Sequence, residues 1–313
     1  MDEIWLENDL LQARIAPLGA ALLGLRWRSG DVPLILEFAD GADPVIQDIW
    51  AGVVVGPVAN RLRTPVPWTG GHLDLPVNEP PQVCLHGAAG GLSRKVWQVQ
   101  DRTAREVTLH LLLADGAGGL PGNRIIWARY TLDGATLKLR LTAQTDAPTP
   151  FAPAHHPYWT LGHEGPAGDF QLTCPARHML PVDDAQVPTG EIRPVDGTIW
   201  DFRGGAAVDG TLDHTLCIAP APAPAPRPVA TLTAPGGMSV DVTSTEPGLQ
   251  VYAGAGLPDV PASRTVGPAC RPGQAIALEP QFWPNAPHHA HFPQITLEPG
   301  RVYTQVTQYS LNA

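Results

Sequence analysis

The sequence is poor in basic residues and in charge as a whole. It contains only two lysines, Lys95 and Lys138, among 313 residues, and charged side chains make up 16% of the chain. No segment gathers lysine and arginine, and the formal net charge is −10. Because nucleic-acid binding proteins displace counterions with clustered cations, this composition argues against a nucleic-acid partner.

Long apolar runs are also missing. No run approaches the roughly 20 residues that a membrane-spanning helix needs. The first ten residues, MDEIWLENDL, lack the basic and apolar regions of a signal peptide. We therefore expect no membrane partner and a cytoplasmic location.

Cysteine is scarce and dispersed. Cys84, Cys174, Cys217 and Cys270 are far apart, and no CxxC pair occurs. Because the sequence carries no secretory signal, reduced thiols are a better interpretation than disulfides.

The sequence is rich in turn residues and in period-two alternation. Its 35 prolines and 32 glycines lie between short apolar runs. Residues 136–142 place leucines on one face and polar residues on the other, and residues 107–111, 238–243 and 302–311 alternate in the same way. No long segment combines apolar residues at helical spacing with a cap and an absence of proline. The pattern predicts an all-β fold.

The length alone would suggest about two domains, but no change of composition separates the two halves of the chain. One stretch is unusual, the alternating Ala-Pro segment at residues 219–228, which favours an extended conformation. It is either a domain linker or a stiff surface loop. The strand pattern resumes at residues 229–233, which favours the loop, and we expect residues 1–313 to form a single domain.

Several segments hold polar residues that a β-core does not require. Asn60 and Arg61 end an apolar run abruptly, and His86 lies in a Leu-His-Gly turn. Asp213 lies within Leu-Asp-His-Thr-Leu. Each of these alone is more typical of a strand end or a turn than of a functional site.

Adjacent histidines at positions 155 and 156 precede Pro-Tyr-Trp. Imidazoles beside aromatic planes suit sugar binding, whereas a histidine pair can also begin a zinc site. Neighbouring strand residues point to opposite faces, so His155 and His156 should not bind one ion.

Glu279 ends the apolar run 275–278. A carboxylate there is costly to bury unless it is paired or functional, and a structural ion pair explains it equally well. The histidines at residues 288–291 have no carboxylate or cysteine in their own segment, which favours a solvated loop over a metal site.

Taken together and in order, these segments resemble the aldose 1-epimerase (galactose mutarotase) family across nearly the whole chain. The matching fragments are Ala-Asn-Arg at 59–61, Leu-His-Gly at 85–87, His-Pro-Tyr-Trp at 156–159, Leu-Asp-His-Thr-Leu at 212–216, Gly-Leu-Gln-Val-Tyr at 248–252, Leu-Glu-Pro-Gln-Phe-Trp-Pro-Asn-Ala at 278–286, Phe-Pro at 292–293 and Leu-Glu-Pro-Gly at 297–300.

The resemblance implies a large antiparallel β-sandwich of the galactose mutarotase type, with its site in a concave face. It implies that Glu279 is the general base, His156 the general acid and His86 a second active-site histidine. It also implies that sugar hydroxyls are bound by Asn60, Arg61, Asp213 and Gln250. The sequence departs from the family pattern beside the acid, at His155 and Pro157, and at Gly56-Pro57 and Asn285. These departures leave open which sugar is preferred.

The implied reaction is the interconversion of the α and β anomers of a free aldose. It requires a base for the anomeric hydroxyl and an acid for the ring oxygen. Nothing is oxidised and no strong nucleophile is generated, so we expect neither cofactor nor metal. Trp159 or Tyr158 would offer an apolar plane to the sugar, and we expect a monomer or a homodimer.

Three other functions remain open at this point. A hexose-6-phosphate mutarotase would need several converging cations, for which Arg61, Arg63, Arg94 and Lys95 are the candidates. A non-catalytic sugar-binding module is disfavoured by the presence of both Glu279 and His156. A glycoside hydrolase would need a second carboxylate beside the bond.

Overall fold

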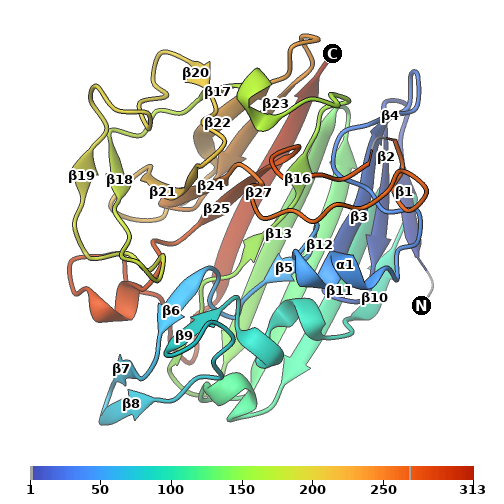
Figure 1. Ribbon diagram of the computed structural model, residues 1–313. Helices are drawn as coiled ribbons and strands as arrows, with labels where there is room; N and C mark the ends of the chain where they lie inside the picture. The colour runs from blue at the N-terminus through green and yellow to red at the C-terminus, as the bar shows by residue number, and fades with distance from the viewer. Residues whose placement is uncertain (1–2, 268) are drawn as a thin grey trace.

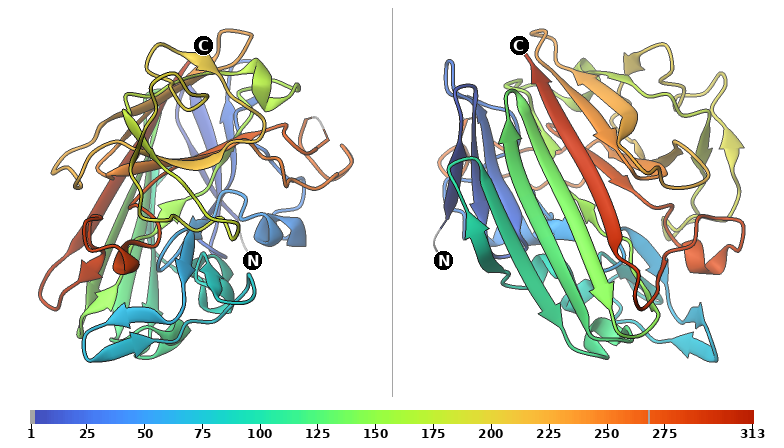
Figure 2. Two further views of the ribbon diagram at one scale, coloured as in Figure 1. Left: turned by 60° about the vertical axis from the view of Figure 1, so that its left-hand side comes forward. Right: turned by 180° about the vertical axis from the view of Figure 1, so that it is seen from behind.

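Antiparallel strands dominate the structure, as the alternation predicts. The computed structural model describes residues 3–267 and 269–313. Within these residues the largest sheet has nine strands and forms one layer of the molecule (Figures 1 and 2). Their order is β10 (Gln98–Arg102), β11 (Glu106–Leu113), β12 (Arg124–Asp133), β13 (Thr136–Thr145), β27 (Tyr303–Asn312), β23 (Ser239–Ser244), β22 (Arg227–Thr233), β17 (Gln171–Thr173) and β20 (Ala206–Ala207).

Two further sheets pack against it. The first has the order β1 (Ile4–Glu7), β2 (Leu11–Ala16), β3 (Ala21–Trp27) and β4 (Val32–Pro33). The second has the order β16 (Tyr158–Trp159), β25 (Ile276–Gln281), β24 (Gly248–Tyr252), β21 (Asp213–Cys217), β18 (His178–Leu180) and β19 (Arg193–Pro194). This second sheet carries part of the candidate site.

The remaining elements are short. Two-stranded pairs are formed by β14 (Thr149–Pro150) with β26 (Thr296–Leu297), β15 (Ala154–His155) with β5 (Val54–Val55), β6 (Arg61–Arg63) with β9 (Val83–Leu85), and β7 (Val66–Trp68) with β8 (Gly71–Leu73). The helices are α1 (Pro44–Asp48) and the 3₁₀ turns η1 (Ala88–Gly90), η2 (Leu92–Arg94), η3 (Ala117–Gly119), η4 (Ala167–Asp169) and η5 (Ala286–His288). Among the described residues, no helix is long and apolar enough to cross a membrane.

Strand β13 shows how the alternation produces the sandwich. Leu137, Leu139 and Leu141 are buried on one face, whereas the intervening Lys138 and Arg140 are more exposed. Because side chains alternate along a strand, a single sequence pattern supplies both a core face and a solvated face.

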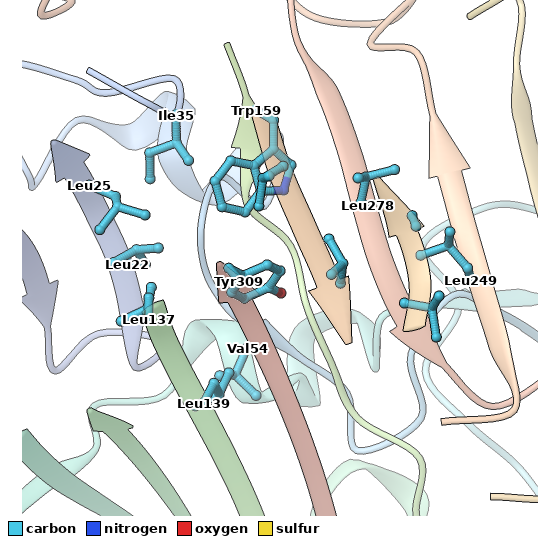
Figure 3. Close-up of a cluster of buried hydrophobic side chains, with 14 of the residues drawn as sticks. Leu22, Leu25, Ile35, Val54, Leu137, Leu139, Trp159, Leu249, Leu278 and Tyr309 are labelled. Carbon is cyan, nitrogen blue, oxygen red and sulfur yellow. The ribbon is translucent and has the colours of Figure 1, made fainter. Parts of the chain in front are cut away.

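The apolar faces of the three large sheets meet in one core. Its buried side chains come from the first strand, Ile4, and from the last, Leu311. Figure 3 shows Trp159 and Tyr309 in this core, with Leu278 from β25 nearby. A core shared by both ends of the chain supports the proposal of a single domain, and the predicted antiparallel sandwich is confirmed.

Two smaller expectations also agree with the structure. Residues 219–226 of the Ala-Pro segment connect β21 to β22, and Arg227 and Pro228 already belong to β22, so the segment is a loop within the sandwich. The four cysteines are buried and unpaired.

Candidate active site

Polar residues that are distant in the sequence line one cavity of about 210 Å³. Glu279 comes from β25, and Asp213 begins β21 in the same sheet. His156 lies between β15 and β16, Arg61 begins β6, and His86 follows β9, the pairing partner of β6. The structure thus brings together residues from five segments that the sequence singled out as polar.

The cavity contains a carboxyl group and an imidazole that face each other. His156 Nε2 lies 3.5 Å from Glu279 Oε1, and the two residues are only 4% and 2% exposed. Glu279 Oε2 has no hydrogen-bonding partner among the residues that the structure describes. A buried carboxyl oxygen without a protein partner is available to a ligand.

Burial disfavours charge on both members of this pair. It lowers the pKa of His156 to about 4. It raises the pKa of Glu279 well above its usual range, with a further rise from the charge of Asp213 and an opposing effect of Arg61. Both pKa shifts therefore favour the uncharged form of each group.

His86 is held in one orientation by the backbone. Its ring Nδ1 accepts a hydrogen bond from the backbone N–H of Asn60 at 3.2 Å. The backbone N–H of His86 donates to the backbone carbonyl of Asn60 at 3.1 Å. Both residues have positive φ, 61° for Asn60 and 55° for His86. Because a neutral imidazole carries one proton, this contact places it on Nε2 and makes His86 a donor. Burial lowers the pKa of His86 well below its usual range, which keeps the ring neutral.

The same contact argues against a metal at this cluster. Possible ligand atoms of His86, His156 and Glu279 lie within 4.8 Å of one another. Two histidines and a carboxylate can bind several transition metals. However, a protonated Nε2 has no free lone pair for an ion. The arrangement therefore fits hydrogen bonding and proton transfer better than metal coordination.

Arg61 is held by two carboxylates. Its Nε and one terminal nitrogen donate to the two oxygens of Glu79 at 2.8 and 3.1 Å. Its other terminal nitrogen lies 3.6 Å from Asp213. The guanidinium is thus fixed at the wall of the cavity.

Gln250 supports Asp213 from the neighbouring strand. Its side-chain nitrogen donates to Asp213 Oδ1 at 2.6 Å, and its oxygen accepts from the Thr215 hydroxyl at 2.5 Å. Gln250 is buried and is not among the residues that line the cavity. We interpret it as a residue that orients Asp213.

The expectation that Trp159 offers a plane to the sugar is wrong. Trp159 is 0% exposed, and its ring lies 5.1 Å from the ring of Tyr309 in the core (Figure 3). His155 points the same way and contacts the Tyr309 hydroxyl at 3.1 Å. Tyr158 lines the cavity instead, because it shares the face of His156 two residues before it. The prediction that the two histidines point apart is confirmed.

Sequence reasoning missed several residues that line the cavity, among them the polar or aromatic Asp48, Trp50, Glu79 and Tyr252. Tyr252 could have been found, because it lies two residues after Gln250 on the same strand. Glu79 lies in a proline-flanked turn, and Trp50 adopts a φ of 56° after α1, so neither follows a periodic pattern.

Three histidines at the end of η5 and just after it contact backbone carbonyls of other loops, outside the cavity. His288, His289 and His291 contact the backbone carbonyls of Arg63, Pro188 and Gly190, respectively. Within the described residues they form no cluster with the geometry of a metal site.

The corrected position of Trp159 gives a first prediction. Trp159→Phe should lower the free energy of unfolding by about 1–3 kcal/mol, because it leaves a gap in the core. It should leave the KM for a monosaccharide unchanged, whereas Tyr158→Leu should raise KM because it removes a plane from the cavity. Urea unfolding and initial rates measure both effects, and a raised KM in Trp159→Phe at unchanged stability would contradict this placement.

Comparisons with known proteins agree with this arrangement. The family profile described as aldose 1-epimerase matches residues 2–310. The galactose mutarotase of Sus scrofa is 30% identical over 99% of this chain and 93% of its own length. The aldose 1-epimerase of Escherichia coli (strain K12) is 28% identical over 94% of this chain and 90% of its own. The crystal structure of an aldose epimerase homologue from C. elegans matches with a TM-score of 0.89 at 29% identity, over 99% of this chain and 98% of the other. The chain belongs to the aldose 1-epimerase family.

Proposed function

We propose that this protein interconverts the α and β anomers of a free, uncharged aldose, with Glu279 as base and His156 as acid. The observation that carries the proposal is the buried pair itself. One carboxyl and one imidazole face each other across 3.5 Å in a small cavity, and the second carboxyl oxygen is unpaired. The family relationship supports the same activity.

The proposed reaction needs one proton donor and one proton acceptor. Glu279 takes the proton of the anomeric hydroxyl while His156 gives a proton to the ring oxygen, and the bond between C1 and the ring oxygen breaks. Rotation about C1–C2 presents the other face of the aldehyde, and the reverse steps close the ring. Protons removed equal protons returned, so the enzyme ends in its starting state.

The shared proton prepares the pair for this cycle. We propose that the free enzyme holds one proton on these two groups, because burial disfavours charge on both of them. The same single proton, placed on His156, gives the acid and the base that ring opening requires. No exchange of protons with bulk water is then needed before reaction.

The other cavity residues are proposed to position the sugar. Arg61 and Asp213 can bind hydroxyl groups through charge-assisted hydrogen bonds. His86 can donate its Nε2 proton to a sugar oxygen while remaining neutral. Tyr158 and Trp50 can cover apolar faces of the ring.

A phosphorylated substrate fits the cavity less well. Of the four cations considered for it, Arg61 alone is among the described residues that line the cavity. Arg61 is already held by Glu79 and Asp213, and Arg63 pairs with Asp183 at 2.5 Å. A dianionic phosphate would therefore lack the converging cations that it requires.

Glycoside hydrolysis is also less well supported, although several carboxylates line the cavity. Asp213 is held by Gln250 and Arg61, and Glu79 forms a bidentate pair with Arg61. Glu279 is the carboxyl with an unpaired oxygen among these three, and the fourth acid of the cavity wall, Asp48, is exposed at the end of α1. A second buried carboxyl free to flank the bond is therefore not present among these four acids, whereas hydrolysis usually needs two carboxyls beside the bond.

The acid–base roles predict the effect of two variants. Glu279→Gln and His156→Asn should each slow anomer exchange by about 10²–10⁴-fold, because positioned acid–base groups typically contribute that much. Both should bind sugar with little change, and the double variant should be little slower than the worse single one. Decay of optical rotation from fresh α-glucose and α-galactose measures the rates.

Glu246 offers a matched control. It is buried like Glu279, and burial raises the pKa of Glu246 to about 8, but it does not line the cavity. Glu246→Gln should keep nearly full exchange activity. Near-normal anomer exchange in Glu279→Gln would contradict the mechanism. If the protein accelerated anomer exchange of hexose 6-phosphates but not of free hexoses, the proposed substrate would be wrong.

The pair also predicts a pH profile. Below an apparent pKa near 4 the pair takes up a second proton, the base is lost, and kcat/KM should fall. Above an upper pKa raised by the burial of Glu279, the shared proton is lost and activity should fall again. Between these limits kcat/KM should be flat through neutrality. An acid limb at the ordinary histidine pKa, after correction for spontaneous mutarotation, would contradict a desolvated pair.

A further inference from the structure

The binding face of Arg61 is occupied by a residue of the protein itself. Glu79 accepts from Nε and from one terminal nitrogen, at 2.8 and 3.1 Å, which is the two-point geometry that a ligand carboxylate or phosphate would use. Asp213 lies 3.6 Å from the remaining terminal nitrogen. One positive charge is thus matched by two negative charges.

The rest of the cavity wall adds further negative charge. Its ionisable acids are Asp48, Glu79, Asp213 and Glu279, and Arg61 is its single lysine or arginine among the described residues. Burial raises the pKa of Glu279, Asp213 raises it further, and Arg61 lowers it. A second negative charge brought into this space would meet repulsion that a neutral hydroxyl group would not.

Glu79 differs from the other acids in what it does for the site. Asp213 is oriented by Gln250 toward the cavity, and Glu279 belongs to the proton-transfer pair. In Glu79, by contrast, both carboxylate oxygens accept hydrogen bonds from Arg61. Its side chain lies in a turn and is 34% exposed. Removal of the Glu79 carboxylate would leave the acid–base pair intact. It would also leave Nε and one terminal nitrogen of Arg61, the two donors of its guanidinium fork, free to bind a ligand.

We propose that Glu79 is a specificity-determining residue that excludes anionic sugars, such as uronates, by occupying the guanidinium fork of Arg61. This proposal rests on the proposed mutarotase function, because it concerns which sugars that same site accepts. Under this proposal, the turn that carries Glu79 selects neutral sugars over anionic ones, whereas Glu279 and His156 carry out the proton transfers.

The test compares two sugars that differ only in the group at C6, which is neutral in one and anionic in the other. Glucose carries a hydroxymethyl group where glucuronate carries a carboxylate, and magnetization-exchange NMR at anomeric equilibrium gives kcat/KM for both. The wild type should favour glucose by at least about tenfold, and Glu79→Gln should raise the ratio of glucuronate to glucose by about tenfold. Glutamine keeps one acceptor for Arg61, so the fold should be maintained.

Glu191→Gln is the matched control. Glu191 forms the same kind of bidentate pair with Arg193, at 2.8 and 2.8 Å, on an exposed surface away from the cavity. It removes the same charge from the protein and should leave the ratio unchanged. An equal change in Glu191→Gln would mean that net charge, and not Glu79, sets the preference.

The outcomes separate the two proposals. If the wild type exchanges neither sugar, the proposed function fails. If it exchanges glucose but Glu79→Gln lowers both rates in proportion, Glu79 only positions Arg61 and the specificity proposal is overturned.

A salt series on the wild type tests the proposal without any variant. Added salt should reduce the ratio of kcat/KM for glucose to that for glucuronate, because Glu79 is partly exposed and its charge is screened. A preference that stays constant with salt would count against the proposal.

Discussion

The mutual burial of Glu279 and His156 is the constraint on which the rest of the site depends. Removing a carboxylate and an imidazolium from water is costly, and each group resists charge more strongly as it is buried. Among the described residues, neither group forms an ion pair with any other side chain. They lie 3.5 Å from each other, and we propose that one proton serves both. A catalyst that must give and take protons in the same step is well served by this arrangement.

The sandwich makes this burial possible because its strands meet at fixed registers. Gln250 lies opposite Glu279, and Thr215 lies opposite Gln250, so three neighbouring strands present polar side chains in one row. Asp213 is oriented from this row and supports the raised pKa of Glu279. The core behind β25 provides the low-polarity surroundings that both groups experience.

Much of this could be predicted from sequence because it follows from the two-residue period of a strand. The leucines of residues 136–142 indicated the core face. Glu279 stood out as an acid at the end of an apolar run, but only the family resemblance implied its role as the base. The same period, counted from His156, favours Tyr158 over Trp159, and neglecting it led to the wrong placement of Trp159. Contacts made by turns could not be predicted from the sequence, because they follow no periodic pattern. Glu79 meets Arg61 through the local course of the chain, and the hydrogen-bond pair of Asn60 and His86 depends on two left-handed backbone conformations.

The most direct test of this account is the protonation state of Glu279 in the free enzyme. Infrared difference spectra between the wild type and Glu279→Gln at neutral pH isolate the signal of this one side chain. We expect the carbonyl stretch of a protonated carboxylic acid, lost in the variant and shifted when a sugar binds. Glu246→Gln should remove a separate band of its own, because burial raises the pKa of Glu246 to about 8. The bands of an ionised carboxylate at Glu279 in the free enzyme would contradict a pair that shares one proton.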